Sequence, residues 1–302
     1  MSDYLVRATA LGGKLRAFAC ITTELVRELS DRQGCLALAS AALGRTATMA
    51  AMIGVTLKGE EKVTLRIEGD GPLGKIVAIG NAKGEVRGYV DNPRVEFPPV
   101  DGIVFGDVEK LDVGRGVGEG FLYVIKDLGM KEPYVGSVPL ATGEIGDDFL
   151  FYFAQSEQVP SAIGLGVLVE KDQTVKQAGG FLIQLLPGVS DEDVDYIEAQ
   201  IKQFPHITSL LEKGHSPEDV LKRLIPGELN ILERQDITFQ CECSRERFER
   251  GLLSLGTTEL RSIIEEDKQA ELVCHFCNEK YLFDETALED LHRQASEKEN
   301  RD

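Results

Sequence analysis

Four cysteines near the C-terminus constrain this chain more than any other feature of its sequence. Cys241 and Cys243 form one close pair, Cys274 and Cys277 form a second, and thirty residues separate the two pairs. Two such pairs on separate segments allow one Zn²⁺ to bind four thiolates tetrahedrally. The spacing therefore predicts a site that holds one zinc ion per chain in the reduced form.

The same spacing permits redox chemistry. A disulfide needs Cα atoms about 4.4–6.8 Å apart, so a bond between Cys241 and Cys243 requires a bent backbone and is expected to be labile. Cys274 and Cys277 have the spacing of readily formed redox dithiols. Each pair can close on itself, so the site can be a switch as well as a structural staple.

Alternatives at this site differ in what the metal does. A purely structural zinc fits four thiolates equally well, whereas a catalytic zinc is disfavoured because four ligands leave no open position. His275, inside the second pair, can replace a cysteine as ligand. An exposed residue at the turn beside the metal is the simpler interpretation of His275.

Composition limits the partners and the compartment. The 302 residues include 51 acidic and 33 basic ones, a formal charge of −18, which repels nucleic acid and anionic membrane surfaces. The first ten residues have no signal-peptide pattern, and no apolar run reaches the ~18 residues of a membrane span. We expect a cytoplasmic protein, in which cysteines at ligand spacing indicate metal or redox function.

Residues 1–188 predict a mixed α+β core. Residues 4–11 and 14–22 alternate like strands around a tight turn at Gly12 and Gly13, Thr23 can cap a helix over 24–30, and 36–53 predict a buried helix. Cys20 and Cys35 lie among apolar neighbours in these segments. We interpret both cysteines as small core hydrophobes and assign them no role.

Two glycine-rich segments of the core resemble nucleotide loops only superficially. Residues 69–74 match GxGxxG, but strand-like residues lie on both sides, so we predict a strand, a turn and a strand. Residues 114–120 lack the lysine and hydroxyl of a phosphate loop, and we predict a turn or bulge at a sheet edge.

The core ends in aromatic and apolar segments. Residues 142–158 predict a helix that packs aromatic side chains on a sheet, 160–169 predict a buried strand, and 179–186 predict a last strand before Pro187 and Gly188.

A helical linker is predicted over residues 189–229. Three narrow apolar stripes are interrupted near Pro205, Gly214 and Pro226, as expected for three short helices. Helices shorter than about 12–15 residues are marginal in water, so their order depends on what they pack against. Residues 190–302 also hold 27 acidic and 14 basic residues, and the linker is expected to be only conditionally folded.

Residues 230–302 predict a small C-terminal zinc-binding domain. Ser244 can cap a helix, Asp284 can cap a final helix, and a hairpin between them carries the second cysteine pair at its turn. So small a unit needs support, and structural zinc supplies about 10–16 kcal/mol. Loss of the metal should unfold this domain.

Several motifs together resemble one family. Phe239-Gln240-Cys241-Glu242-Cys243-Ser244-Arg245-Glu246-Arg247 and Cys274-His275-Phe276-Cys277-Asn278 are similar to the redox-switch domain of the heat shock protein 33 family, the 33 kDa chaperonin. The core motifs that follow the family's order are Gly69-Asp70-Gly71-Pro72, Arg87-Gly88-Tyr89-Val90, Lys131-Glu132-Pro133-Tyr134, Ser156-Glu157-Gln158 and Gly179-Gly180-Phe181. The resemblance covers essentially all 302 residues.

The resemblance implies an ATP-independent holdase, not an enzyme. In such a protein the reduced, zinc-bound form is inactive. Oxidation would pair Cys241 with Cys243 and Cys274 with Cys277, release zinc, and unfold the C-terminal domain and linker. Exposed apolar surface would then bind unfolding client proteins under oxidative and heat stress, and the active form would be a homodimer.

Two hypotheses from other classes remain open beside this one. A constitutive protein-interaction module with a purely structural zinc would behave alike before and after oxidation. A zinc or thiol enzyme would lose turnover when a single cysteine is replaced.

Overall fold

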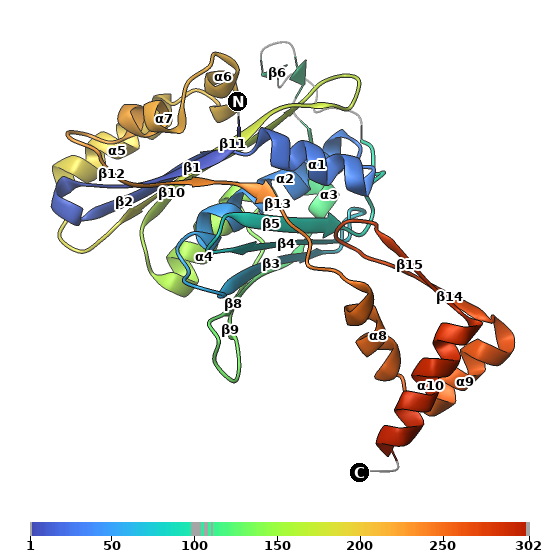
Figure 1. Ribbon diagram of the computed structural model, residues 1–302. Helices are drawn as coiled ribbons and strands as arrows, with labels where there is room; N and C mark the ends of the chain where they lie inside the picture. The colour runs from blue at the N-terminus through green and yellow to red at the C-terminus, as the bar shows by residue number, and fades with distance from the viewer. Residues whose placement is uncertain (1, 98–103, 106–107, 110, 300–302) are drawn as a thin grey trace. The chain divides into compact units, whose positions relative to one another are not determined.

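The computed structural model describes residues 2–97, 104–105, 108–109 and 111–299. The chain divides into two compact units, Met1–Gln240 and Cys241–Asp302. The first unit contains two large sheets with helices packed on them, and the second is a small unit of helices and one hairpin (Figure 1). This confirms the predicted α+β class.

A five-stranded antiparallel sheet has the strand order β10-β11-β2-β1-β12. Its strands are β1 (Tyr4–Ala10), β2 (Leu15–Ile21), β10 (Ser161–Val169), β11 (Val175–Leu185) and β12 (Asn230–Asp236). The predicted first hairpin is confirmed: a single 3-10 turn, η1 (Leu11–Gly13), joins β1 to β2, and Gly12 and Gly13 have positive φ angles of 66° and 87°. Glycine adopts this left-handed backbone without a Cβ clash.

The strand predicted over 160–169 is present as β10, but the prediction that it is buried was wrong. Eight of the nine residues of β10 are only half-buried, and Val169 alone is buried. The reason is its position: β10 is an end strand of the sheet, and among the described residues it pairs only with β11.

Two helices follow the first hairpin, α1 (Thr23–Gln33) and α2 (Ala37–Gly54). Almost all of α2 is buried, as predicted from its apolar sequence. The prediction that Thr23 caps α1 was wrong, because the helix begins at Thr23 itself. Instead, Asp3 satisfies a backbone amide of the first helical turn: its Oδ2 accepts the Leu25 N–H at 2.7 Å. Cys20 and Cys35 are buried in the core, as expected.

A second sheet has six strands in the order β13-β5-β4-β3-β8-β9. Its strands are β3 (Lys62–Gly69), β4 (Lys75–Asn81), β5 (Glu85–Val90), β8 (Gly120–Asp127), β9 (Tyr134–Pro139) and β13 (Thr238–Phe239). The antiparallel pairing of β3 with β4 confirms the predicted strand, turn and strand around residues 69–74. A separate two-stranded ladder joins β6 (Val104–Phe105) to β7 (Val108–Glu109).

The glycine-rich segment 114–120 is not a simple turn or bulge as predicted. It forms most of a short helix, α3 (Val113–Val117), because the Asp112 side chain accepts the Arg115 N–H and caps the first turn. Glycine is needed here for close approach: a Cβ on Gly116 would lie 2.9 Å from side-chain atoms of Leu38 and Leu73.

The aromatic segment is helical, as predicted. It forms α4 (Gly146–Tyr152) and then one π-helical turn, η2 (Phe153–Glu157). Phe149 and Tyr152 are fully buried in the main core of the first unit. Their role is packing.

The linker contains the three short helices predicted from its stripes. They are α5 (Asp191–Gln203), α6 (Ile207–Glu212) and α7 (Pro217–Leu224), and the Ser190 and Ser216 side chains cap the first and the last. Figure 1 shows them together on one side of the five-stranded sheet. The other face of that sheet contributes Leu5, Phe18 and Leu182 to the main core with α2.

Residues 230–240 belong to the first unit. β12 pairs with β1, and β13 pairs in parallel with β5, so this segment joins both sheets. The second compact unit therefore begins at Cys241, eleven residues after the start expected for the last domain.

The second unit is built as its sequence predicts. It comprises α8 (Arg245–Leu253), α9 (Thr257–Glu266), β14 (Gln269–Val273), β15 (Lys280–Asp284) and α10 (Glu285–Glu299). Ser244 accepts the Arg247 N–H at 3.3 Å and Asp284 accepts the Ala287 N–H at 2.9 Å, which confirms both predicted caps. The apolar core of this unit is small and centres on Leu260, Phe283 and Leu288.

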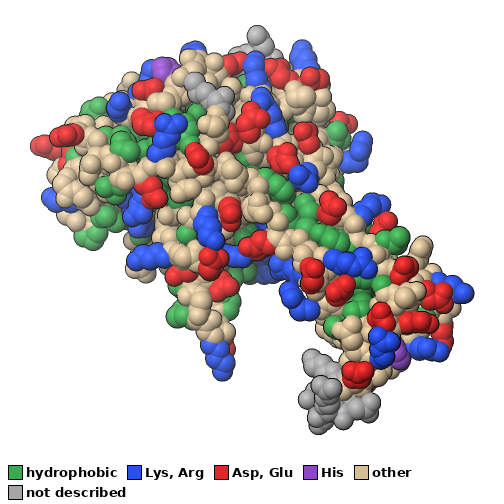
Figure 2. Space-filling view, in the orientation of Figure 1, with side chains coloured by type: hydrophobic (Ala, Val, Ile, Leu, Met, Phe, Trp, Pro, Cys, Tyr) green, Lys and Arg blue, Asp and Glu red, His purple; other side chains and the backbone are tan. Residues whose placement is uncertain are grey.

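Charged side chains of both signs are distributed over the visible surface of each unit (Figure 2). Within the described residues, no helix combines the length and the apolar character needed to cross a membrane.

Candidate metal centre

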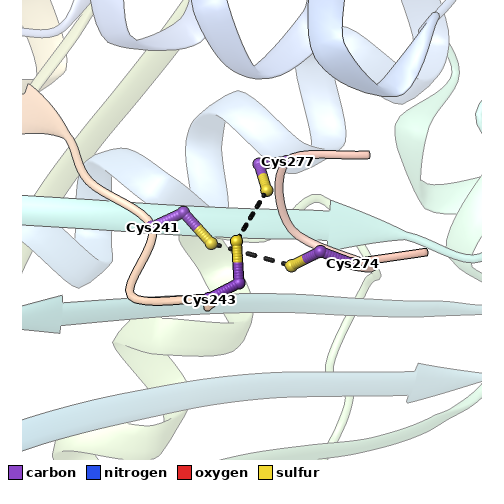
Figure 3. A group of neighbouring side chains, drawn as sticks. All are labelled: Cys241, Cys243, Cys274 and Cys277. Carbon is purple, nitrogen blue, oxygen red and sulfur yellow. Dashed lines mark hydrogen bonds between the residues drawn. The ribbon is translucent and has the colours of Figure 1, made fainter. Parts of the chain in front are cut away.

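The four C-terminal cysteines converge from two segments. Cys241 and Cys243 lie on the extended stretch between β13 and α8, and Cys274 and Cys277 lie in the turn that joins β14 to β15. Figure 3 shows the four sulfurs pointing toward a common centre. The sequence predicted this set, and the structure brings all four together.

The second cysteine pair is held by a tight backbone turn. The Cys274 N–H donates to the Glu279 carbonyl at 2.9 Å, and the Asn278 N–H donates to the Cys274 carbonyl at 2.8 Å. Asn278 adopts a positive φ of 57°, a conformation that asparagine tolerates better than most residues. The turn thereby directs both thiols to the same side.

The sulfur positions suit a tetrahedral ion. All four Sγ atoms lie within 4.8 Å of one another, with 3.7 Å between Cys241 and Cys274 and 3.3 Å between Cys243 and Cys277. A tetrahedron with zinc–sulfur bonds of about 2.3 Å has edges of about 3.8 Å. The donor set and its geometry are therefore consistent with a metal site.

One hydrogen bond distinguishes Cys243 from its neighbours. The Tyr281 hydroxyl donates to its Sγ at 3.3 Å, and this bond raises the pKa of Tyr281. Burial opposes ionisation of Cys243, but hydrogen bonds from Tyr281 and the other thiols outweigh burial and lower its pKa. Burial raises the pKa of Cys241 to about 11 and also raises that of Cys277. The surroundings thus favour the thiolate at Cys243.

The remaining candidate residues stay outside this cluster. His275 is exposed at the turn and is not among the clustered ligand atoms, in keeping with the simpler interpretation of this residue. Cys20 and Cys35 are buried in the first unit, and burial raises the pKa of both thiols, to about 12 for Cys35. Protonated, inaccessible thiols react slowly with oxidants.

The contact between Tyr281 and Cys243 was not predicted from the sequence. Tyr281 follows the second cysteine pair by four residues and faces Phe248 of α8, with 4.8 Å between ring centroids. The hairpin that contains it was predicted. The bond from Tyr281 to Cys243 depends on the folded hairpin, and the spacing of residues carries no signal for it.

Comparison with known proteins agrees with this site and fold. The family model described as "Hsp33 protein" matches residues 3–284, a range that includes all four clustered cysteines. The 33 kDa chaperonin of Bacillus subtilis is 51% identical over 295 residues, which are 97% of this chain and 99% of that protein. The 33 kDa chaperonin of Listeria monocytogenes serotype 4a is 48% identical over 98% of this chain and 100% of its own length.

A solved structure is similar over the same length. The crystal structure of the 33 kDa chaperonin from Thermotoga maritima superimposes with a TM-score of 0.89 at 38% identity, covering 98% of this chain and 100% of that one. The chain belongs to the Hsp33 family. It is accordingly a chaperone of the 33 kDa chaperonin type and not an enzyme.

Proposed function

We propose that this chaperone is a redox-regulated, ATP-independent holdase. In the reduced form, Cys241, Cys243, Cys274 and Cys277 bind one Zn²⁺ and the chaperone is inactive. Oxidation converts the four thiolates into two disulfides, zinc leaves, and the apolar surface that is exposed binds unfolding proteins. The family membership and the four-sulfur cluster support this proposal.

The proposal assigns a task to each part of the chain. Residues 1–188 form the chaperone and dimerisation core, 189–229 form a metastable helical linker, and 230–302 carry the redox switch. The last ten residues before Cys241 are paired with the sheets of the core. The switch is therefore connected directly to the strands that it would release.

The main support for the proposal is the apolar sheet surface that the linker covers. The outer face of the five-stranded sheet is apolar, and α5, α6 and α7 bury their apolar stripes against it. The linker side chains in the apolar cluster with this face are Ile197, Ile207, Leu210, Leu211, Val220, Leu221, Leu224 and Ile225. Unfolding of these helices would expose a sheet face that includes Val6, Leu15 and Phe181.

Few polar contacts attach these helices to the sheet in the described residues. The Tyr4 hydroxyl donates to Glu218 of α7 at 2.9 Å, and the exposed Lys176 ammonium pairs with Glu212 of α6 at 2.6 Å. Exposed ion pairs are weak and are screened by salt. Apolar contact with the sheet, rather than charge, is what keeps the linker folded.

Loss of the metal would remove the main support of the second unit. Its apolar core is small, and structural zinc contributes about 10–16 kcal/mol in domains of this kind. Once the four sulfurs are oxidised, they no longer act as thiolate ligands. The second unit would then unfold and leave the linker without a folded neighbour in the chain.

We propose unfolding proteins and a second copy of this chain as partners, and the cytoplasm as the compartment. The formal charge of −18 disfavours nucleic acid and anionic membranes. The same charge would keep a chaperone–client complex dispersed.

The test follows light scattering of a thermally unfolding client protein. We expect no protection by the reduced, zinc-loaded chain and strong protection by chain treated with peroxide at raised temperature, with about one zinc released per chain. Equal behaviour of the two forms with zinc retained would instead indicate a constitutive interaction module with a structural metal.

A further inference from the structure

β12 is held to the rest of the first unit mainly by backbone hydrogen bonds of its ladder with β1. It is the end strand of the five-stranded sheet, and six residue pairs connect it to β1 from Tyr4↔Asp236 to Thr9↔Asn230 (Figure 1). The register shifts between Arg7 and Ala8. Six of its seven residues are exposed and the seventh is only half-buried. The strand therefore gains little from side-chain burial.

β1 has the opposite character. Five of its seven residues are buried, and Tyr4, Val6 and Ala8 form part of the apolar face that the linker covers. Opposite Tyr4 and Val6, β12 places Asp236 and Arg234. The Arg234 guanidinium lies over the Tyr4 ring, 3.7 Å from its centroid. Charged side chains thus continue the apolar row of β1 opposite Tyr4 and Val6, whereas Ile231 lies opposite Ala8.

This arrangement protects the edge of the five-stranded sheet from pairing with other chains. Charged residues on an end strand discourage another chain from pairing with it. β12 carries Glu233, Arg234 and Asp236, and Glu233 lies 4.0 Å from Arg7. In the folded chain, β12 satisfies the main-chain groups of β1 while offering a poor template for further strands.

Both ends of β12 join segments that the proposed switch disorders. The linker helix α7 ends at Leu224, six residues before β12 begins. On the other side, β13 pairs with β5 through two residues only, and Cys241 follows two residues later. Loss of order in the linker and the second unit would leave β12 held by its ladder to β1 and, at its C-terminal end, by the buried Ile237 and the short pairing of β13 with β5.

We propose that β12 is a displaceable strand, and that the freed edge of β1 binds an extended apolar segment of an unfolded client by antiparallel strand addition. This inference rests on the proposed holdase function. Main-chain hydrogen bonds to β1 give binding that does not depend on client sequence. Alternate apolar side chains of the client would extend the row of Tyr4, Val6 and Ala8, opposite which β12 places charged residues at Tyr4 and Val6 and Ile231 at Ala8.

A peptide pair tests the main-chain component. One fluorescein-labelled eight-residue peptide alternates valine with threonine and lysine, and its partner has the same side chains with alternate amides N-methylated. We expect the first peptide to bind oxidised chain and not reduced chain, and the second to bind at least about tenfold more weakly because several hydrogen bonds are lost. Equal binding of both peptides would overturn strand addition in favour of non-directional apolar contact.

A tethered variant tests the location. Arg7 and Glu233 face each other in the ladder, and such antiparallel pairs have Cα separations within disulfide range. We expect the variant carrying Arg7→Cys and Glu233→Cys, once oxidised, to lose at least about tenfold in affinity for the unmethylated peptide. The matched control, Lys62→Cys with Asn81→Cys, tethers β3 to β4 with the same number of added thiols and should bind like wild type.

The outcomes separate this inference from the function on which it rests. If oxidised wild type fails to suppress client aggregation, the holdase proposal and this inference both fail. If it protects, but the tethered variant binds the peptide as well as the control does, only strand addition at β1 is overturned. A dimer that the tether abolishes, with peptide binding insensitive to N-methylation, would assign the freed edge to a second copy and would also overturn the proposal.

Discussion

The hydroxyl of Tyr4 in the first strand donates a hydrogen bond to the carboxylate of Glu218 in α7, 214 positions further along the chain, at 2.9 Å. Tyr4 is 6% exposed, and burial together with this bond raises the pKa of Tyr4 to about 12. The contact attaches the linker to the sheet that it covers.

Replacement of this hydroxyl should loosen the linker. We expect Tyr4→Phe to destabilise the folded linker by about 1 kcal/mol, the usual net value of one hydrogen bond. Hydrogen exchange of the α7 amides in the reduced protein should become faster, while zinc content stays unchanged. Tyr196→Phe is the matched control, since Tyr196 lies in the same linker but is 44% exposed. Identical exchange in the two variants would show that the bond contributes nothing.

Loss of one metal ligand should unfold the second unit alone. Cys277→Ser removes a sulfur from the cluster, and the remaining three thiols should not retain zinc at wild-type affinity. We expect reduced zinc content and rapid proteolysis within residues 241–302, with the first unit intact. Cys35→Ala, which alters a buried thiol of the first unit, should keep its zinc. Retention of zinc by both variants would argue against a four-sulfur ligand set.

The pairing of the disulfides can be read by peptide mapping. In the folded cluster short sulfur separations join the two pairs, 3.3 Å between Cys243 and Cys277 and 3.7 Å between Cys241 and Cys274. The proposed bonds lie within the pairs, between Cys241 and Cys243 and between Cys274 and Cys277. Trypsin cleaves after Arg245, so bonds within the pairs should leave the two pairs on separate peptides in a non-reducing digest. A covalently linked peptide pair would instead demonstrate cross-pair oxidation.

A buried carboxyl gives the first unit a measurable pH dependence. Burial raises the pKa of Asp3 from 3.8 to about 6, although hydrogen bonds from backbone amides of α1 oppose the rise. Its Oδ1 has no hydrogen-bond partner in the described part of the chain. The folded state therefore binds the proton more tightly than the unfolded state does, and stability should fall as pH rises from about 4 to about 6.

Asp3→Asn should remove that slope. The amide oxygen can still accept the Leu25 N–H, and no charge is buried at neutral pH. We expect the variant to be more stable than wild type at pH 7 by up to ~3 kcal/mol and similar to it near pH 4, as measured by urea unfolding of reduced protein. Asp31→Asn, at an exposed site on α1, is the control. A pH profile unchanged by Asp3→Asn would show that another group is responsible.

Much of the candidate site could be predicted because its information is local. The spacing of four cysteines is a property of two short stretches, and the caps at Ser244 and Asp284 are set within three residues of the helices they start. The three linker helices are likewise marked by their own apolar stripes and breaks. Such features depend little on the rest of the fold.

Features that depend on distant pairing escaped prediction. Thr23 has the chemistry of a cap, but Asp3 of the preceding strand provides the side-chain acceptor for α1. The sequence of β12 is mostly polar and carries no alternating pattern, and its register with β1 is irregular. Its partner β1 lies more than 220 residues earlier in the chain. The half-burial of β10 follows from its end position in the sheet. In each case the deciding partner is far away in the chain.

The spacing of the cysteines has a further consequence when the cluster is viewed as a cross-link in a polymer. Four sulfurs held at one point close a loop of some thirty residues, and in the chain-entropy model a closure of that size restricts the unfolded chain by roughly 3–4 kcal/mol. Disulfides within the pairs would enclose rings of only one or two intervening residues, which restrain almost nothing beyond themselves. Oxidation by the proposed route would thus form two covalent bonds and still open the large loop, so the chain would gain conformational freedom by becoming more covalently bonded.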